Sequence, residues 1–306
     1  MQAEEAVSAL DRARVSVRLE APGAVRLSGP DARRFCNGMF THNVRDLPVG
    51  GAHRSALLDD RGRVRGLLWL GCVGPDAFVA FPDGGFGAEF ASRFGSFLVF
   101  DDVEVEALDL SAGFHLAGPS AATALAAAGL PTPTGVAEAG GGWVVAANRL
   151  GVPGWDVWGV SPMEPSVGSD VAQVLRVRAG RPIWPDDVGD KRLVHELGLH
   201  GEVLNFSKGC YIGQETVNRV DVMGGVKRRL TGLVLPAGES VRPGASVEHE
   251  GELLGAISSV AAVGGGALAL AVLKIPFDTP GSPVEVVVGE ERVPANTAAF
   301  PLPLPR

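Results

Sequence analysis

The segment V-R-L-S-G-P-D-A at Val25–Ala32 returns 89 residues later as F-H-L-A-G-P-S-A at Phe114–Ala121. In each copy a short strand-like stretch precedes Gly-Pro, and apolar residues at helical spacing follow it. Proline is well tolerated in the first turn of a helix, because the N–H that it lacks would have no partner there. The repeated strand, Gly-Pro turn and helix therefore predict two related α+β halves.

The rest of the chain can be divided by the spacing of its apolar residues. Residues 14–28 alternate as strands, residues 87–97 have helical spacing, and residues 99–108 alternate again. We expect Ser169 to cap another helix and residues 186–192 to form a surface loop. The last part contains five short strand-like segments separated by Gly and Pro, at 230–235, 245–248, 253–259, 267–273 and 284–288.

Such a run of short strands is typical of a small antiparallel barrel. We place the domain boundary near Arg228, with an α+β region over residues 1–228 and a barrel domain over residues 229–306. The uncharged window 253–273 is long enough to span a bilayer, but it contains Gly264-Gly265-Gly266. A hairpin of two buried strands accounts for it better than a membrane helix does.

Composition excludes several classes of protein. The 306 residues are 46% hydrophobic and 20% charged, as in globular proteins, and the net charge of -8 argues against a general nucleic-acid binder. Three cysteines without a C-x-x-C pair predict reduced thiols and no four-cysteine zinc site. The first residues contain no apolar run, so we expect no signal peptide and a cytoplasmic protein.

Several motifs that suggest an active site fail on spacing. Gly85–Phe90 lacks the third glycine of a dinucleotide loop and follows a Pro-Asp-Gly turn. His195 and His200 are five residues apart, whereas a zinc-protease helix needs a spacing of four, although Glu196 could still face a ligand. No G-x-S-x-G elbow occurs, and the Asp-Asp pairs are typical of solvated turns.

One stretch, Asn205–Thr216, concentrates reactive groups. Lys208 lies two residues before Cys210, and a nearby ammonium favours the thiolate, the form that attacks electrophiles and binds metals. A basic patch follows, which suits a carboxylate-bearing ligand or a solvated face equally well (Arg219, Lys227, Arg228 and Arg229). The alternative is a buried cysteine in a turn flanked by polar surface residues.

The segment Lys208–Glu215, K-G-C-Y-I-G-Q-E, resembles the K-G-C-Y-x-G-Q-E signature of the YgfZ-type folate-binding proteins. These are relatives of the glycine-cleavage T-protein and assist iron–sulfur cluster assembly or repair. The similarity also covers Leu27–Ala32, Thr41–Val44, Gly151–Trp155 and the barrel strands.

The resemblance implies an α+β fold: a duplicated, ferredoxin-like folate-binding body around a central cavity, with a C-terminal antiparallel β-barrel. It also implies tetrahydrofolate or a one-carbon derivative as ligand, and iron–sulfur client or assembly proteins as partners. Cys210 and Lys208 become the candidate catalytic residues. The candidate folate-binding residues are Tyr211, Gln214, Glu215, Arg219, Glu196 and Asn43.

Two departures from related sequences affect the expected function. The T-protein has Asp-Asp where this chain has Arg65-Gly66, which argues against glycine cleavage. Arg178 replaces a glutamate that is common in the family and suited to the pterin amide edge. We therefore expect a folate-binding accessory factor for iron–sulfur proteins. The alternatives are a tetrahydrofolate-dependent aminomethyl- or methyltransferase, and a binding module that has lost its ligand.

Overall fold

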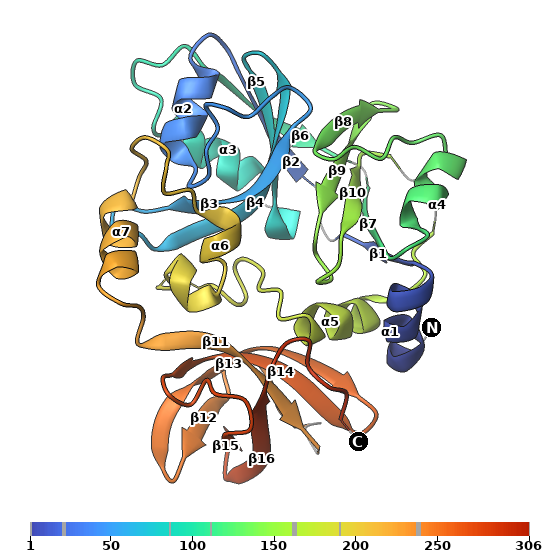
Figure 1. The fold of residues 1–306 in the computed structure, drawn as a ribbon, viewed down its shortest axis with the longest axis vertical. Coiled ribbons are helices and arrows are strands. Elements are labelled where there is room, and N and C mark those ends of the chain that lie inside the picture. Colours follow the sequence, from blue (N-terminus) through green and yellow to red (C-terminus); the bar gives the residue numbers. More distant parts are fainter. Residues whose placement is uncertain are drawn as a thin grey trace.

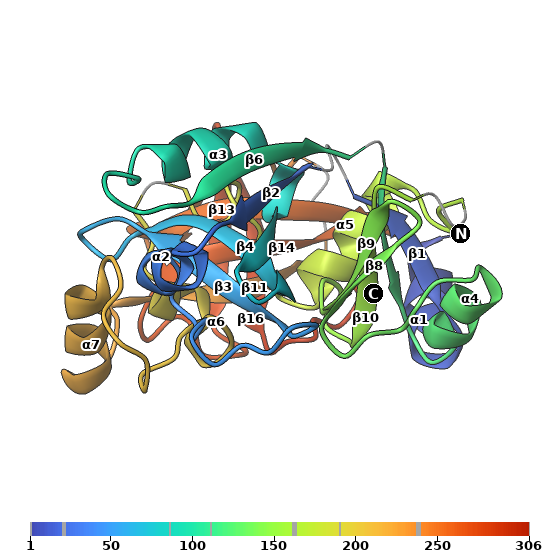
Figure 2. The same ribbon diagram turned by 90° about the horizontal axis from the view of Figure 1, so that it is seen from above.

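The computed structural model describes residues 2–19, 23–85, 87–110, 112–160, 164–189, 191–236 and 240–305. It consists of two five-stranded antiparallel sheets that lie side by side above a closed six-stranded barrel (Figures 1 and 2). This is the α+β architecture with a C-terminal antiparallel barrel that the sequence predicts. Among the described residues, none of the helices has the length and apolar character needed to cross a bilayer.

Each half carries one copy of the repeat in the interior of its sheet. The first sheet has the order β3-β4-β5-β2-β6 and the second β1-β7-β10-β9-β8, so that β2 and β7, the repeated strands, each have a neighbour on both sides. The first sheet comprises β2 (Gly23–Ser28), β3 (Ala52–Leu58), β4 (Val64–Gly74), β5 (Ala77–Pro82) and β6 (Glu104–Asp109). The second comprises β1 (Val15–Arg18), β7 (Gly113–Ala117), β8 (Val136–Ala139), β9 (Gly142–Ala147) and β10 (Gly154–Trp158).

The Gly-Pro turns explain why the repeat is recognisable. Gly29 has φ +134° and Gly118 has φ +105°, values that favour glycine. A Cβ at Gly29 would lie 2.4 Å from the Asp102 carbonyl oxygen, so the position also lacks space for a side chain. The helices that follow the turns are α2 (Ala32–Met39) and α4 (Ala121–Ala127).

The remaining helices connect the halves to the barrel. In Figure 1, α5 (Ser169–Arg178) lies between the second sheet and the barrel, and it packs on β13 and β14. Gly168, not Ser169, occupies its N-cap position. The others are α1 (Ala3–Arg12), α3 (Gly87–Gly95), α6 (His200–Val203) and α7 (Gln214–Val222), with short 3-10 turns at Asp83–Gly85 and Val194–Leu197.

The barrel closes on itself in the order β11-β14-β13-β12-β15-β16, with β16 paired to β11. The predicted hairpin at 253–273 is confirmed as β13 and β14. Alanine, valine and leucine side chains fill the barrel interior. Its strands are β11 (Arg228–Leu235), β12 (Ser246–His249), β13 (Glu252–Val263), β14 (Gly266–Lys274), β15 (Pro283–Val288) and β16 (Glu291–Ala298).

Two further local predictions are wrong. The segment 186–192 is not wholly a surface loop, because Asp187 and Val188 are buried. Asp187 accepts a hydrogen bond from Arg176 at 2.7 Å, which offsets the cost of burying its charge. The strand expected over 99–108 begins only at Glu104.

The two halves meet through apolar faces of their sheets. Phe81 of the first sheet packs against Trp143 and Trp158 of the second, at ring-centroid distances of 6.5 and 5.4 Å. At Gly71 in β4 the sheets approach so closely that a Cβ would lie 2.8 Å from a methyl carbon of Val136 in β8.

We expect Gly71→Ala to lower the free energy of unfolding by about 1–3 kcal/mol, because the added methyl group overpacks the junction of the two halves. Urea unfolding followed by circular dichroism measures the change. Gly95→Ala is the matched control, since no atom lies within 4 Å of a Cβ there. Equal stability of the two variants would contradict this account of the junction.

Candidate functional site

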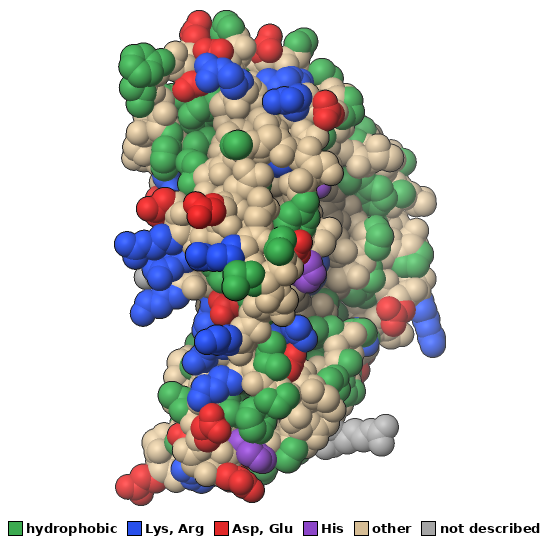
Figure 3. Space-filling view, turned by 60° about the vertical axis from the view of Figure 1, so that its left-hand side comes forward, with side chains coloured by type: hydrophobic (Ala, Val, Ile, Leu, Met, Phe, Trp, Pro, Cys, Tyr) green, Lys and Arg blue, Asp and Glu red, His purple; other side chains and the backbone are tan. Residues whose placement is uncertain are grey.

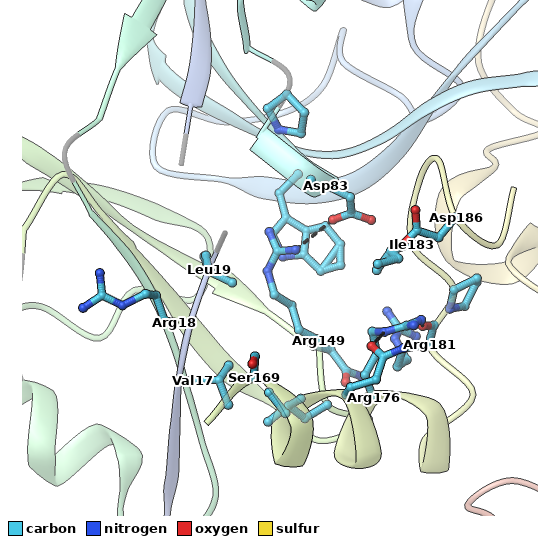
Figure 4. Close-up of a pocket in the computed structure, with 18 of the residues that line it drawn as sticks. Val17, Arg18, Leu19, Asp83, Arg149, Ser169, Arg176, Arg181, Ile183 and Asp186 are labelled. Atoms are coloured by element: carbon cyan, nitrogen blue, oxygen red, sulfur yellow. Dashed lines mark hydrogen bonds and ion pairs between the residues drawn. The ribbon is translucent and has the colours of Figure 1, made fainter. Parts of the chain in front are cut away.

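A cavity of about 250 Å³ lies where the two sheets, α5 and the segment after it meet (Figure 4). Its size is near the lower end of the range for small-molecule sites. Arg54 comes from β3, Trp69 from β4, Arg149 follows β9, and Trp158 ends β10. Five arginines but only two aspartates line it, although the whole chain is acidic (Arg18, Arg54, Arg149, Arg176, Arg181, Asp83 and Asp186).

An alternating chain of charges runs through the wall of the cavity. Asp83 accepts hydrogen bonds from Arg54 at 3.0 Å and from Arg149 at 2.8 Å, as the dashed line to Arg149 marks in Figure 4. Arg149 continues to Asp156 at 2.7 Å, and Asp156 contacts the Nδ1 atom of His115 at 2.8 Å. The halves of the protein are thus joined by ionic contacts as well as apolar ones.

The charge chain is stable because each buried ion has an opposite partner. Burial opposes the charge of Arg149, but Asp156 and Asp83 outweigh it and raise the pKa of the guanidinium. Burial would also raise the pKa of Asp156, but Arg149 and His115 together hold it below its usual value. At the other end, Arg181 binds both carboxylate oxygens of Glu202 at 2.7 and 2.8 Å.

Several buried polar atoms in the residues that line the cavity have no hydrogen-bond partner among the described residues. Five are donors: Nε of Arg54, Nη2 of Arg149, Nε of Arg181, and the indole nitrogens of Trp69 and Trp158, whereas Nη1 of Arg54 forms an ion pair with Glu202 at 3.5 Å. One is an acceptor, Oδ1 of Asn148. Buried donors without partners are rare and costly, so they indicate a site that a polar ligand or water completes.

The thiol predicted to be functional lies elsewhere. Cys210 is exposed at a groove of about 430 Å³ that shares no lining residue with the cavity. The groove combines an apolar floor, which includes Met39 and Ile212, with the guanidinium groups of Arg34 and Arg45. Cys36 and Cys72 are buried.

Lys208 holds this part of the chain in place. Its ammonium group donates hydrogen bonds to the carbonyl oxygens of Asn37 at 2.6 Å, of His42 at 3.0 Å, and of Phe40. These carbonyls surround the C-terminal end of α2, where the helix dipole favours a cation. The ammonium is committed to three backbone acceptors, so these contacts give it a positional role and do not direct it at the Cys210 thiol.

The other predicted site residues do not line the cavity either. Tyr211 packs with its ring 4.9 Å from the Lys208 ammonium, and burial raises the pKa of its hydroxyl to about 12. Gln214 begins α7, on which Glu215 and Arg219 are exposed.

Glu196 and Asn43 also have local roles. Glu196 accepts a hydrogen bond from the Leu193 amide at 3.0 Å, and Asn43 donates to Asp46 at 2.8 Å. The predicted basic patch is present on the surface: Figure 3 shows Lys and Arg side chains gathered on the face that carries α7 and the start of the barrel.

The two histidines of the zinc-like motif do come together, because the chain turns at Gly198 between them. Their rings stack with centroids 5.6 Å apart. Within the described ranges no group of three or more potential ligands could hold a metal ion.

The Arg65-Gly66 departure has a steric basis. A Cβ at Gly66 would lie 2.1 Å from the Phe90 ring, so an aspartate cannot fit there without rearrangement. Trp69 lines the cavity, and Leu67, two residues before it on β4, shares its face of the strand. Neither Arg65, Gly66 nor Arg178 lines the cavity.

Sequence reasoning missed the residues that form the cavity. Asp83 belongs to the Pro-Asp-Gly segment that was interpreted only as a turn, and it is 2% exposed. Arg54 and Arg149 lie in no recognisable motif. A signal was present in Trp69 and Trp158, which account for two of only five tryptophans.

Comparison with known proteins agrees with the overall fold. The crystal structure of glycine cleavage system aminomethyltransferase T from Bartonella henselae matches with a TM-score of 0.83 and 19% identity, covering 98% of this chain and 89% of that one. The chain has the aminomethyltransferase fold. The match extends over both α+β halves and the barrel.

Sequence relatives carry related names. A chloroplastic protein of Arabidopsis thaliana, named provisionally as a transferase, is 26% identical over 84% of this chain and 64% of its own length. An aminomethyltransferase of Rippkaea orientalis is 31% identical over 44% of this chain and 37% of its own length. The chain therefore spans less than two thirds of these curated relatives. No family model matches the chain.

We expect the His42–His53 pair, next to Arg54 on β3, to make stability depend on pH. The two rings stack at a centroid distance of 4.1 Å, and burial, with His42 nearby, lowers the pKa of His53 from 6.5 to about 3. Between these values the unfolded chain binds a proton that the folded protein does not, so acid destabilises the fold. Lowering the pH from 7.5 to 5.5 should cost about 1.4 kcal/mol through this group.

Urea unfolding at both pH values measures this loss. The variant His53→Phe should lose about 1.4 kcal/mol less than the wild type between pH 7.5 and 5.5. The control His249→Phe changes a histidine on the barrel and should retain the wild-type dependence. An unchanged pH dependence in His53→Phe would show that another group is responsible.

Proposed function

We propose that this chain is a YgfZ-type protein that binds tetrahydrofolate or a one-carbon derivative in the cavity and assists the assembly or repair of iron–sulfur proteins in the cytoplasm. One observation carries the proposal: an aminomethyltransferase fold contains a cavity whose arginine and tryptophan walls have unpaired donors. The K-G-C-Y-I-G-Q-E motif supports the more specific assignment.

The cavity has the chemistry that a folate requires. The indole N–H groups of Trp69 and Trp158 are buried donors in the cavity wall, and the guanidinium groups suit glutamyl carboxylates. Arg149 lies 5.7 Å from the ring centroid of each tryptophan, so one cation connects the two indoles in the wall. These residues would hold the folate, and the folate would supply one-carbon chemistry when bound.

Aminomethyl transfer is the less favoured function. At positions 65 to 69, β4 offers the cavity Trp69 and no carboxylate, and Phe90 excludes one at Gly66. Asp83 is the buried carboxylate of the wall, but guanidinium groups occupy both its oxygens. Both of its oxygens are held by arginines of the wall, so these contacts give the carboxylate a structural role.

The separate position of Cys210 indicates how the thiol would act. It is exposed beside a groove, so a macromolecular partner can reach it without entering the cavity. A single thiol cannot hold a cluster alone, and the other two cysteines are buried. The remaining ligands would therefore come from the client protein or a second copy.

Isothermal titration of the whole chain with tetrahydrofolate should give saturable binding in the micromolar range. No aminomethyl transfer should follow when methylene-tetrahydrofolate formation is assayed with an aminomethylated carrier protein. Absence of heat at high micromolar ligand would refute the folate proposal, and turnover would favour the transferase alternative.

Cys210→Ser should fail to restore the activity of iron–sulfur enzymes in cells that lack the native protein, while folate binding and thermal stability stay unchanged. The reason is that the thiol lies outside the cavity and is not part of the core. Ser207→Ala, a change at an exposed neighbour, should restore activity fully. Full rescue by Cys210→Ser would exclude a role for the thiol.

A further inference from the structure

We propose that the groove at Cys210 is a site of thiol–disulfide exchange with a small disulfide that carries carboxylates. The reaction leaves one half of that disulfide bonded to Cys210, and Arg45 and Asn37 hold its carboxylate. The inference rests on the proposed function in that Cys210 is the working thiol in both. It adds a reactant for that thiol and does not depend on the cavity between the sheets.

The thiol has a defined position because its segment is fixed against α2. The Ile212 amide donates to the carbonyl oxygen of Gly38 at 3.1 Å, and both residues line the groove with Cys210. Cys210 is exposed, whereas Cys36 and Cys72 are buried, and burial raises the pKa of the Cys36 thiol. Exchange needs a thiolate that can reach a disulfide sulfur, so Cys210 is the cysteine that fits this reaction.

Arg45 is a cation without a counter-ion at this groove. Its side chain is exposed and lines the groove, and it has no ion pair or hydrogen bond to another described residue. Its Nη2 atom lies 3.7 Å from the position that a Cβ would take at Gly209, the residue before Cys210. The guanidinium group is therefore within reach of a carboxylate on a molecule whose sulfur meets the thiol.

The second arginine of the groove is already paired. Arg34 contacts Asp31 at 3.1 Å and Asp101 at 2.9 Å. Asp101 also lines the groove, but its ion pair with Arg34 offsets its charge. Arg45 is thus left as an excess positive charge among the lining residues, although the whole chain is acidic. This local charge favours an anionic reactant over a neutral or cationic one.

Asn37 supplies an independent sign of a ligand. It is 8% exposed, and its Oδ1 atom accepts hydrogen bonds from the amides of Val44 at 3.1 Å and of Arg45 at 3.3 Å. These contacts fix the side chain, which lines the groove, but its Nδ2 group donates to no other described residue. A nearly buried donor without a partner indicates a site that an acceptor completes. A carboxylate has only acceptors and matches both this donor and the Arg45 guanidinium.

The groove also has room for the carbon skeleton of such a molecule. Its volume of about 430 Å³ lies within the usual range for small-molecule sites. Phe35 and Met39 line it and belong to the core of the first half, so this apolar floor is held in place by packing. No atom lies within 4 Å of a Cβ at Gly38, which leaves open space beside α2.

The exchange step balances without a further oxidant. The Cys210 thiolate attacks one sulfur of the disulfide, a new sulfur–sulfur bond forms, and the original one breaks. Cys210 is oxidised to the mixed disulfide, and the other half is reduced and leaves as a thiolate. The proton that Cys210 gave up passes through water to this leaving group. The mixed disulfide removes the free thiol, so the reaction would connect the protein to the redox state of small thiols.

Exchange rates with two small disulfides test the proposal on the intact, reduced chain. Oxidised glutathione carries carboxylates, whereas 2-hydroxyethyl disulfide is neutral, and intact-mass spectrometry follows each adduct over time. Oxidised glutathione should add a single adduct to the wild type and none to Cys210→Ser. An adduct on Cys210→Ser would place the reaction at another cysteine and overturn the proposal. A wild type that reacts with the neutral disulfide only would also overturn it.

Two variants test the carboxylate contacts. Arg45→Gln should slow the reaction with oxidised glutathione by about fivefold and change the reaction with 2-hydroxyethyl disulfide by less than about twofold. Asn37→Asp keeps oxygens that accept from the Val44 and Arg45 amides but replaces the free donor by a negative charge, so it should slow the glutathione reaction at least as much. Equal slowing with both disulfides would show that Arg45 acts on the thiol and not on the ligand, which would overturn the carboxylate site.

Arg12→Gln is the matched control. Arg12 is exposed, has no ion pair to another described residue, and ends α1, which lies on the opposite side of the molecule from α2 (Figures 1 and 2). This variant should react like the wild type with both disulfides. If Asn37→Asp does not fold, which thermal unfolding would reveal, the exposed substitution Arg45→Gln still decides.

The outcomes distinguish this inference from the proposed function. Equal rates of the wild type and Arg45→Gln with oxidised glutathione would refute the exchange site and leave the proposed function intact. Selective exchange at Cys210, together with full rescue of iron–sulfur enzymes by Cys210→Ser, would do the reverse.

Discussion

Asp83 lies between two arginines that belong to different parts of the protein. Arg54 comes from the first sheet and Arg149 from the second, and both donate to the same buried carboxylate. Removing one member of such a group would leave an uncompensated buried charge, at a cost of about 3–5 kcal/mol. The relative position of the two sheets, and hence the shape of the cavity between them, therefore depends on this contact.

A second ionic group connects the cavity to the barrel. Arg176 lines the cavity from α5, pairs with Asp187 at 2.7 Å and donates to the hydroxyl of Ser259 in β13, also at 2.7 Å. Asp187 in turn accepts a hydrogen bond from Ser258. The barrel therefore helps to hold Arg176 in place in the cavity wall. Motion of the barrel relative to α5 would therefore displace Arg176 in the cavity wall.

The cavity and the thiol are two sites with different chemistry. The cavity is lined by buried cations and indoles, as suits a small acidic ligand. Cys210 lies at an open groove, and Lys208 anchors its segment to the end of α2. Under the proposed function, this separation would let the protein bind a small molecule and present a thiol to a partner at the same time.

The sequence by itself determined the repeated strand, Gly-Pro turn and helix, and the barrel strands. These features depend on local periodicity and on backbone needs such as the positive φ of Gly29 and Gly118. Only the tertiary structure decided the cavity. Asp83 is 29 residues from Arg54 and 66 residues from Arg149, and the three residues share no motif. Their contact depends on how the two sheets pack. Likewise, the carbonyl partners of Lys208 lie about 170 residues before it, so its anchoring role could not be inferred from its neighbours.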